Sequence, residues 1–245
     1  MKTIAVAGGT GLVGRLVVNS VRRQGCEPIV IARSTGVDLT TGRGLDEALE
    51  GVDAVIDVTN IVTQSRRRAT TFFETSTRHL LDAEQRRGVG HHVLLSIVGI
   101  DRVGMGYYRA KLAQEALVRQ SPVPWTILRA TQFHEFAAQM LGDRRVAVVP
   151  SMSSQPVAAQ DVADELVRLA TAAAAGMAPE LAGPRQEQVA DMVRRLAAAT
   201  SRRTVVLTIP LPGTAGRAMR TGALLPTGPG PRGTQTFDEW LQDAT

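Results

Sequence analysis

A tyrosine and a lysine four positions apart are the residues in this chain best suited to catalysis. Tyr107 and Lys111 fall in a predicted helix over residues 107–119, so their spacing places both side chains on one face. The chain has only two lysines beside 26 arginines, which suggests that an amine is needed here. A lysine ammonium can hydrogen-bond ribose hydroxyls and lower the pKa of a nearby phenol from about 10. The phenol can then exchange a proton with a carbonyl oxygen while a nicotinamide carries the hydride.

A serine at the end of the preceding predicted strand, residues 93–96, completes a candidate catalytic set. Ser96 could hold the same carbonyl oxygen as Tyr107. Tyr108 follows directly, so either phenol could face a cofactor, although only Tyr107 keeps the four-residue step to Lys111. The alternative is that Lys111 is a surface lysine beside aromatic residues that pack.

The first glycine cluster matches the pattern G-x-G-x-x-G between a predicted strand, residues 3–7, and a predicted amphipathic helix, residues 12–24. In that context the glycines permit a tight turn, close approach of a pyrophosphate, and packing of the helix on the strand. The helix N-terminus then offers free amides to phosphates. The alternative is a glycine-rich turn without a ligand. The predicted dinucleotide-binding residues are Gly8, Gly9, Thr10, Gly11, Leu12, Val13 and Gly14.

The end of the second predicted strand, residues 28–32, indicates which dinucleotide binds. Sites that prefer NAD usually place Asp or Glu there to hold the ribose 2′-hydroxyl, whereas this strand leads into Arg33 and Ser34. A guanidinium fork and a hydroxyl suit a 2′-phosphate, so NADP(H) is favoured and NAD(H) stays possible. The alternative is that Arg33 is one more surface arginine. Asp38 and Leu39, after a short third strand, could flank the adenine.

Alternating strands and helices must position these residues. The predicted strands are apolar on both faces, which indicates a parallel sheet covered by helices on both sides. In such sheets ligands bind outside the carboxyl ends of the strands. The predicted substrate-side residues after the sixth strand are therefore Thr131, Gln132 and Phe133, with ordinary helix packing as the alternative. The remaining predicted elements of this part are strands at 53–59 and 125–129 and helices at 45–50 and 70–87.

Beyond residue 132 the alternation loosens. Residues 208–233 are rich in proline and glycine, which predicts a surface loop, a lid or a partly disordered segment. Residues 237–241 are expected to dock the C-terminal end. The elements predicted here are strands at 146–149 and 205–209 and helices at 160–175 and 185–199.

Composition limits the functional classes. The chain has 245 residues and a single cysteine, Cys26, which excludes an intrachain disulfide and fits a cytoplasmic location. No secretory signal is evident, and no apolar run approaches the ~18 residues that span a bilayer. The net charge is +5, but the arginines are scattered among acidic residues and no nucleic-acid motif accompanies them. No spacing of Cys, His and carboxylates suggests a metal site.

The sequence resembles the short-chain dehydrogenase/reductase superfamily, in its atypical, NmrA-like branch of NAD(P)-binding proteins. The segments that carry the resemblance are GGTGLVG at 8–14, GVDAVIDVTN at 51–60, LLSIVGID at 94–101, YYRAK at 107–111 and VPWTILRATQF at 123–133, with looser matches at 160–170 and 236–241.

This resemblance implies an α/β Rossmann fold, a doubly wound parallel sheet with a small C-terminal substrate-capping region. The chain would form one NAD(P)-binding domain, with a core over about residues 1–150 and a substrate-side portion over about 151–245. Arg33 matches the family's NADP-selecting arginine. Ser96, Tyr107 and Lys111 match the reductase catalytic set, and Gly8, Gly11 and Gly14 the phosphate loop. Thr59 and Asn60 lie where the nicotinamide ribose passes.

The first functional hypothesis is an NADP(H)-dependent oxidoreductase that acts on a small carbonyl or conjugated substrate. The second is a non-catalytic protein that binds NADP(H) and serves as a redox sensor or regulator, as some NmrA-like relatives do. The third is a nucleotide-sugar epimerase, for which the short C-terminal part leaves little room. The sequence predicts neither the substrate nor the oligomeric state.

Overall fold

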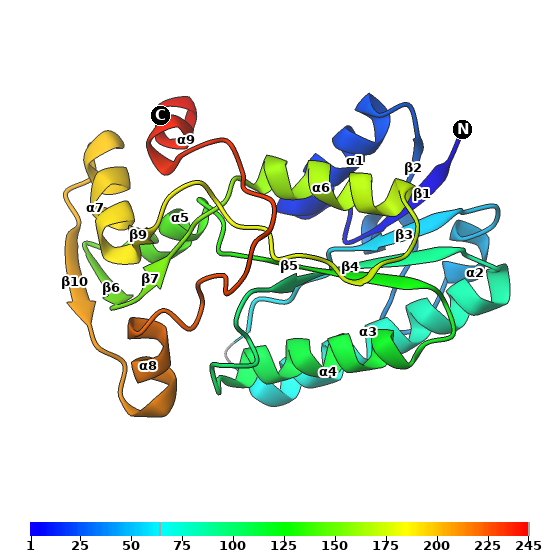
Figure 1. Cartoon of the computed structure of the whole chain (residues 1–245), viewed down its shortest axis with the longest axis horizontal. Coiled ribbons are helices and arrows are strands. Elements are labelled where there is room, and N and C mark those ends of the chain that lie inside the picture. The colour runs from blue at the N-terminus through cyan, green and yellow to red at the C-terminus, as the bar shows by residue number, and fades with distance from the viewer. Residues whose placement is uncertain (64, 245) are drawn as a thin grey trace. The chain divides into compact units, whose positions relative to one another are not determined.

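The computed structural model describes residues 1–63 and 65–244, and the chain divides into two compact units (Figure 1). The first unit comprises Met1–Ser96, Gly106–Arg129 and Val162–Ala178. The second unit comprises Ile97–Met105, Ala130–Asp161 and Pro179–Thr245. Segments of the two units alternate along the chain. The assignment of one domain, with a core over about residues 1–150, stays a prediction.

A six-stranded sheet with the order β2-β1-β3-β4-β5-β8 organises the first unit. β1 is parallel to both β2 and β3, and Ala7 lies opposite Ile31 on one side and Asp57 on the other. The carboxyl ends of the three strands therefore coincide, at the position where a doubly wound sheet binds ligands. The strands are β1 (Thr3–Ala7), β2 (Glu27–Ile31), β3 (Ala54–Asp57), β4 (His91–Ile97), β5 (Trp125–Ala130) and β8 (Gly176–Met177).

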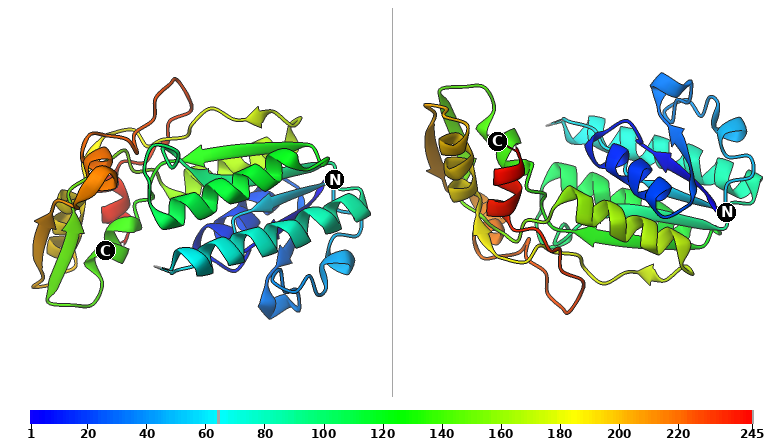
Figure 2. Two further views of the ribbon diagram at one scale, coloured as in Figure 1. Left: turned by 90° about the horizontal axis from the view of Figure 1, so that it is seen from below. Right: turned by 90° about the horizontal axis from the view of Figure 1, so that it is seen from above.

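Helices cover both faces of this sheet: α1 and α6 lie over one face and α3 and α4 over the other (Figure 1). Two further views show α3 and α4 side by side along their length (Figure 2). Every residue of β3 is buried, as expected for a strand packed on both faces. The doubly wound α/β fold is thereby confirmed. The helices are α1 (Leu12–Arg23), α2 (Leu45–Ala48), α3 (Arg66–Arg87), α4 (Gly106–Gln120) and α6 (Ala159–Thr171).

The second unit contains two small sheets. β6 (Val146–Pro150) and β10 (Val205–Ile209) pair in parallel, and β7 (Ser153–Ser154) pairs with β9 (Glu187–Gln188) in antiparallel orientation. α7 packs on β6 and β10 and also contacts α5. The helices of this unit are α5 (Phe136–Leu141), α7 (Val189–Ala199), α8 (Gly213–Arg220) and α9 (Phe237–Ala244).

The prediction of a short third strand before Asp38 is wrong. After β2 the chain forms a 3₁₀ turn over Arg33–Thr35 instead. The Thr35 hydroxyl donates to the Val30 and Ala32 carbonyls and accepts from the Ala32 amide, and Gly36 follows with φ +85°, so the chain turns away from the sheet.

Helix boundaries also differ from the predictions. α3 begins at Arg66 rather than Thr70, because the Ser65 hydroxyl accepts from the Arg68 amide and caps it. α7 begins at Val189 rather than Arg185, because β9 occupies Glu187–Gln188. The structure places α8 inside the segment predicted to be a loop, a lid or partly disordered.

Candidate cofactor and catalytic site

The glycine loop joins β1 to α1. Gly8 has a φ of +82°, which glycine adopts without strain, and its amide donates to the Ile31 carbonyl on β2 over 3.0 Å. Gly11 caps α1 and has no side chain with which to occupy the first amides of the helix. Thr10 is exposed, and its carbonyl accepts from Arg15 Nη1 over 2.6 Å. Among the predicted residues, Leu12 is exposed, while Gly9 and Gly14 are buried.

The backbone around this loop leaves no room for a side chain at Gly14 and little at Gly8. A β-carbon built at Gly14 would overlap the Gly8 carbonyl oxygen, and one at Gly8 would lie 3.1 Å from the Val58 carbonyl oxygen. Beside Gly8, the Thr59 hydroxyl is buried without a hydrogen-bond partner in the described part of the chain. Close backbone approach, free helix amides and a spare hydroxyl fit a dinucleotide phosphate and its ribose.

The residues after β2 divide into two groups. Arg33 and Ser34 are exposed in the 3₁₀ turn and available to a ligand. Hydrogen bonds from Thr40 hold the pKa of Asp38 below its usual value, and the nearby charge of Arg33 contributes. Leu39 is 9% exposed and packs in a hydrophobic core cluster, and its assignment to the adenine stays a prediction.

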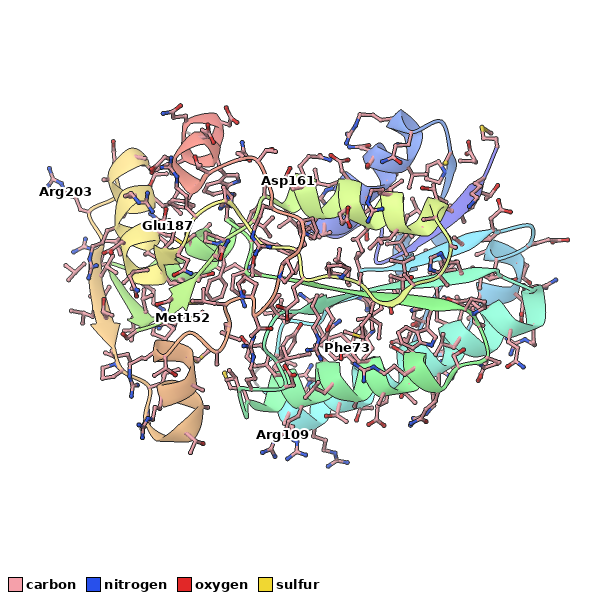
Figure 3. The ribbon with its side chains drawn as sticks, in the orientation of Figure 1. Phe73, Arg109, Met152, Asp161, Glu187 and Arg203 are labelled. Carbon is pink, nitrogen blue, oxygen red and sulfur yellow. The ribbon has the colours of Figure 1, made fainter. Side chains whose placement is uncertain are left out.

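Tyr107 and Asn60 meet across two elements of the first unit. The Tyr107 hydroxyl, near the start of α4, donates to Asn60 Oδ1 after β3 over 2.7 Å. Its ring packs edge-on against Phe73 of α3, with centroids 5.8 Å apart. Figure 3 shows Phe73 between the sheet and the helices, whereas Arg109 of α4 points outward. Burial raises the pKa of Tyr107 to about 12, so the phenol is protonated at neutral pH.

Lys111 lies one turn further along α4 and is buried. Its Nζ donates to the Leu95 carbonyl over 2.8 Å and to Gln114 Oε1 over 2.6 Å, and it lies 5.0 Å from the centre of the Phe73 ring. Burial lowers the pKa of Lys111 to about 8, against the opposing charges of Asp57 and Glu115. The amine is therefore still mostly protonated at neutral pH.

The Ser96 hydroxyl, predicted to hold the substrate oxygen, has a partner within the protein, and its catalytic role stays a prediction. The Ser96 hydroxyl is buried and donates to Glu115 Oε1 over 2.6 Å. The same carboxylate accepts from Arg129 Nε over 2.9 Å and from Arg129 Nη2 over 2.8 Å. Ser96 thus belongs to a buried ion-pair cluster between β4, α4 and β5.

The predicted substrate-side residues belong to the second unit. The Thr131 hydroxyl is buried and donates to the Gln155 carbonyl over 2.6 Å. The Gln132 carbonyl accepts from the Val157 amide, and Phe133 pairs with Val157 in a parallel bridge. Their assignment to a substrate stays a prediction.

Sequence reasoning missed two polar residues that hold the Lys111 amine in place. Gln114 bonds Lys111 directly, and Asp57, at the end of β3, bonds Gln114 Nε2 over 2.9 Å. A signal was present, because Gln114 follows Lys111 by three positions, which places the two side chains together on a helix. Asp57 was a second signal, because it is the polar last residue of an otherwise apolar strand.

Two absences hold for residues 1–63 and 65–244. No helix in those ranges is long and apolar enough to cross a membrane. Nor do three or more His, Cys, Asp or Glu side chains there gather in a way that could hold a metal ion.

The sequence pattern of a family described as NAD(P)H-binding matches residues 8–173. The chain is 32% identical over 218 residues to a (4-alkanoyl-5-oxo-2,5-dihydrofuran-3-yl)methyl phosphate reductase of Streptomyces griseus, covering 79% of this chain and 73% of that protein.

Solved structures share the fold. An NADPH-dependent quinone oxidoreductase from Escherichia coli in complex with NADPH matches with a TM-score of 0.73 and 18% identity, over 98% of this chain and 99% of that chain. A short-chain dehydrogenase/reductase superfamily protein from Agrobacterium tumefaciens with bound NAD matches with a TM-score of 0.72 and 20% identity, over 99% and 95%.

Proposed function

Because the chain belongs to the NAD(P)H-binding family, as its resemblance to short-chain dehydrogenases/reductases predicted, we propose that it is an NADP(H)-dependent oxidoreductase of the NmrA-like type. It would transfer hydride to or from a small carbonyl or conjugated substrate. The observation that carries the proposal is the pair formed by Tyr107 and Lys111. The Tyr107 hydroxyl lies 2.7 Å from Asn60 Oδ1, and the pair shares its unit with the glycine loop.

The cofactor would be held by the loop over residues 8–14, with its phosphates at the first amides of α1. The unpartnered Thr59 hydroxyl would bond its ribose. Arg33 and Ser34, exposed after β2, would bind the 2′-phosphate that distinguishes NADP(H) from NAD(H). When bound, the nicotinamide supplies the hydride.

Tyr107 would act as the proton donor. A phenol with a pKa of about 12 is protonated at neutral pH and can give its proton to an oxygen that gains negative charge. Lys111 would hold a ribose hydroxyl and stabilise the phenolate that forms. Ser96 is better placed to support Glu115 than a substrate, because its hydroxyl already donates to that carboxylate.

The Streptomyces relative favours a conjugated substrate. The name of its substrate describes a ring double bond next to a ring carbonyl and an alkanoyl group. Reduction of such a double bond places hydride on carbon and negative charge on a carbonyl oxygen, which is the charge that a protonated Tyr107 can neutralise.

Titration of the wild-type protein and Arg33→Ala with NADPH and with NADH tests the cofactor assignment. Loss of a charge-assisted contact to the 2′-phosphate should weaken NADPH binding about 10- to 100-fold and leave NADH binding nearly unchanged. Arg22→Ala, an exposed arginine in the last turn of α1, is the matched control and should change neither. An equal loss for both cofactors in Arg33→Ala would refute the 2′-phosphate assignment.

Two observations also fit a second candidate, a redox sensor that binds NADP(H) without turnover. Burial raises the pKa of Tyr107, and Lys111 already has two acceptors within the protein. Both features suit a binding protein as well as a reductase. Tight NADPH binding without oxidation of NADPH, across a panel of quinones, enones and unsaturated lactones, would favour the sensor.

A further inference from the structure

We propose that Gln114 is a positioning residue that fixes the Lys111 amine and ties it to the cofactor loop; the assignment of Lys111 itself rests on the proposed function. Gln114 lies one turn after Lys111 on α4, and its side chain is fully buried. Its Oε1 accepts from Lys111 Nζ over 2.6 Å, and its Nε2 donates to Asp57 Oδ2 over 2.9 Å and to Thr77 Oγ1 over 3.1 Å.

The neighbours of Gln114 require an amide in this orientation. An ammonium only donates hydrogen bonds and a carboxylate only accepts them. If the amide were turned over, its nitrogen would face the donors of Lys111 and its oxygen would face Asp57. Gln114 thus joins a cation to an anion without adding charge, which an apolar side chain of similar size could not do.

The hydrogen bonds of Lys111 leave one proton for a ligand. An ammonium has three donors, and two are held by the Leu95 carbonyl of β4 and by Gln114. With two donors fixed, the amine cannot rotate freely and the direction of the third is set. Gln114 therefore decides where Lys111 can bind a ribose hydroxyl.

The same chain of bonds reaches the glycine loop. Asp57, which accepts from Gln114, also accepts from the Thr59 amide over 2.8 Å. The Thr59 backbone lies 3.2 Å from the position of a β-carbon on Gly8. Lys111, Gln114, Asp57 and Thr59 thus form one buried path from the predicted catalytic amine to the cofactor loop.

Several charged groups surround this path. Asp57 on β3 and Glu115 on α4 favour the protonated amine, while burial disfavours it. Glu115 is itself paired with Arg129 on β5. Glu84 on α3 and His92 on β4 form a buried pair, and the charge of Asp57 raises the pKa of both. These charged groups stay the same when Gln114 is substituted, so a change in the titration of Lys111 reports the loss of Gln114.

The two lysines of the chain allow a direct measurement. Protein labelled only in lysine with ¹³Cε and ¹⁵Nζ gives signals from Lys2 and Lys111, and a Lys2→Arg variant assigns them. A pH titration of these signals reports the proton affinity of Lys111 without any need for turnover. Lys2, exposed and bonded to the Thr171 carbonyl, is the internal reference.

Two substitutions should move Lys111 in opposite directions. Gln114→Met removes an acceptor from the ammonium and should lower its proton affinity about tenfold. Gln114→Glu sets a carboxylate against the amine and should raise it about tenfold. Gln120→Met, at the exposed end of the same helix, should leave Lys111 unchanged. In each variant the Lys2 signal should titrate as in the wild type.

An unchanged proton affinity of Lys111 in Gln114→Met would overturn the proposal. If Gln114→Met does not fold, Gln114→Glu still decides, because an unchanged or lowered affinity would refute the assignment. Where NADPH turnover is observed, the alkaline limb of the kcat profile should move with Lys111 in both variants. Absence of turnover in the wild type would count against the proposed function. The titration of Lys111 would still test the role of Gln114.

Discussion

The two parallel sheets of the molecule are covered to different extents. In the six-stranded sheet of the first unit, all four residues of β3 are buried. In the sheet of β6 and β10, buried and exposed residues alternate along β6: Val149 is fully buried, whereas its neighbour Val148 is 53% exposed. Leu207, opposite Val148 in the register, is also exposed. α7 covers one face of this small sheet, and the other face is open in the described structure.

The difference explains how the first unit can bury an amine such as that of Lys111. An amine such as Lys111 acquires an altered pKa only when helices on its face exclude water, and α3 and α4 do so here. A buried amine also needs hydrogen-bond acceptors, which the Leu95 carbonyl and Gln114 supply. A sheet with one open face provides no such enclosure.

Substitution of Gly14 should have the largest effect on the enclosed sheet. A β-carbon in Gly14→Ala would overlap the Gly8 carbonyl oxygen, so the loop or α1 must shift. We expect a loss of about 3 kcal/mol in stability and no detectable binding of NADPH. Urea unfolding and a fluorescence titration measure the two effects. Gly228→Ala, where a β-carbon meets no atom within 4 Å, is the control. Equal losses in both variants would contradict the role given to the close backbone contact at Gly14.

Removal of the Tyr107 hydroxyl should change turnover and spare the fold. Tyr107→Phe keeps the packing against Phe73 but removes the proton donor and the bond to Asn60. If Tyr107 is the acid, kcat should fall about 100- to 10,000-fold with NADPH affinity nearly unchanged. Tyr108→Phe, the adjacent position, serves as the comparison in the same assay. A larger fall in Tyr108→Phe would transfer the proton-donor role to Tyr108.

Sequence alone could predict the elements with strong local signals. The apolar runs at 3–7 and 205–209 became β1 and β10 without a change of bounds. The helix after the glycine loop was predicted to within one residue of its end. The helix predicted over residues 107–119, which carries Tyr107 and Lys111, differs from α4 by one residue at each end.

Contacts between distant segments could not be predicted in this way. Whether Ser96 faces Tyr107 or Glu115 depends on where α4 lies over β4, and spacing along the chain does not contain that information. The helix α8 starts at Gly213 and contains Gly216, both unfavourable in helices. A β-carbon at Gly216 would overlap the Leu211 carbonyl oxygen, so close packing favours glycine where helix propensity opposes it.

The smallest expected effect tests the open face of the small sheet. Val149→Thr places a hydroxyl in a fully buried position of β6 and should cost about 1–3 kcal/mol. Val148→Thr makes the same change one residue earlier on the exposed face, and should stay within about 0.5 kcal/mol. Urea unfolding of both variants at one pH gives the difference directly. Equal costs would mean that the outer face of β6 and β10 is covered in solution, and the contrast between the two sheets would then fail.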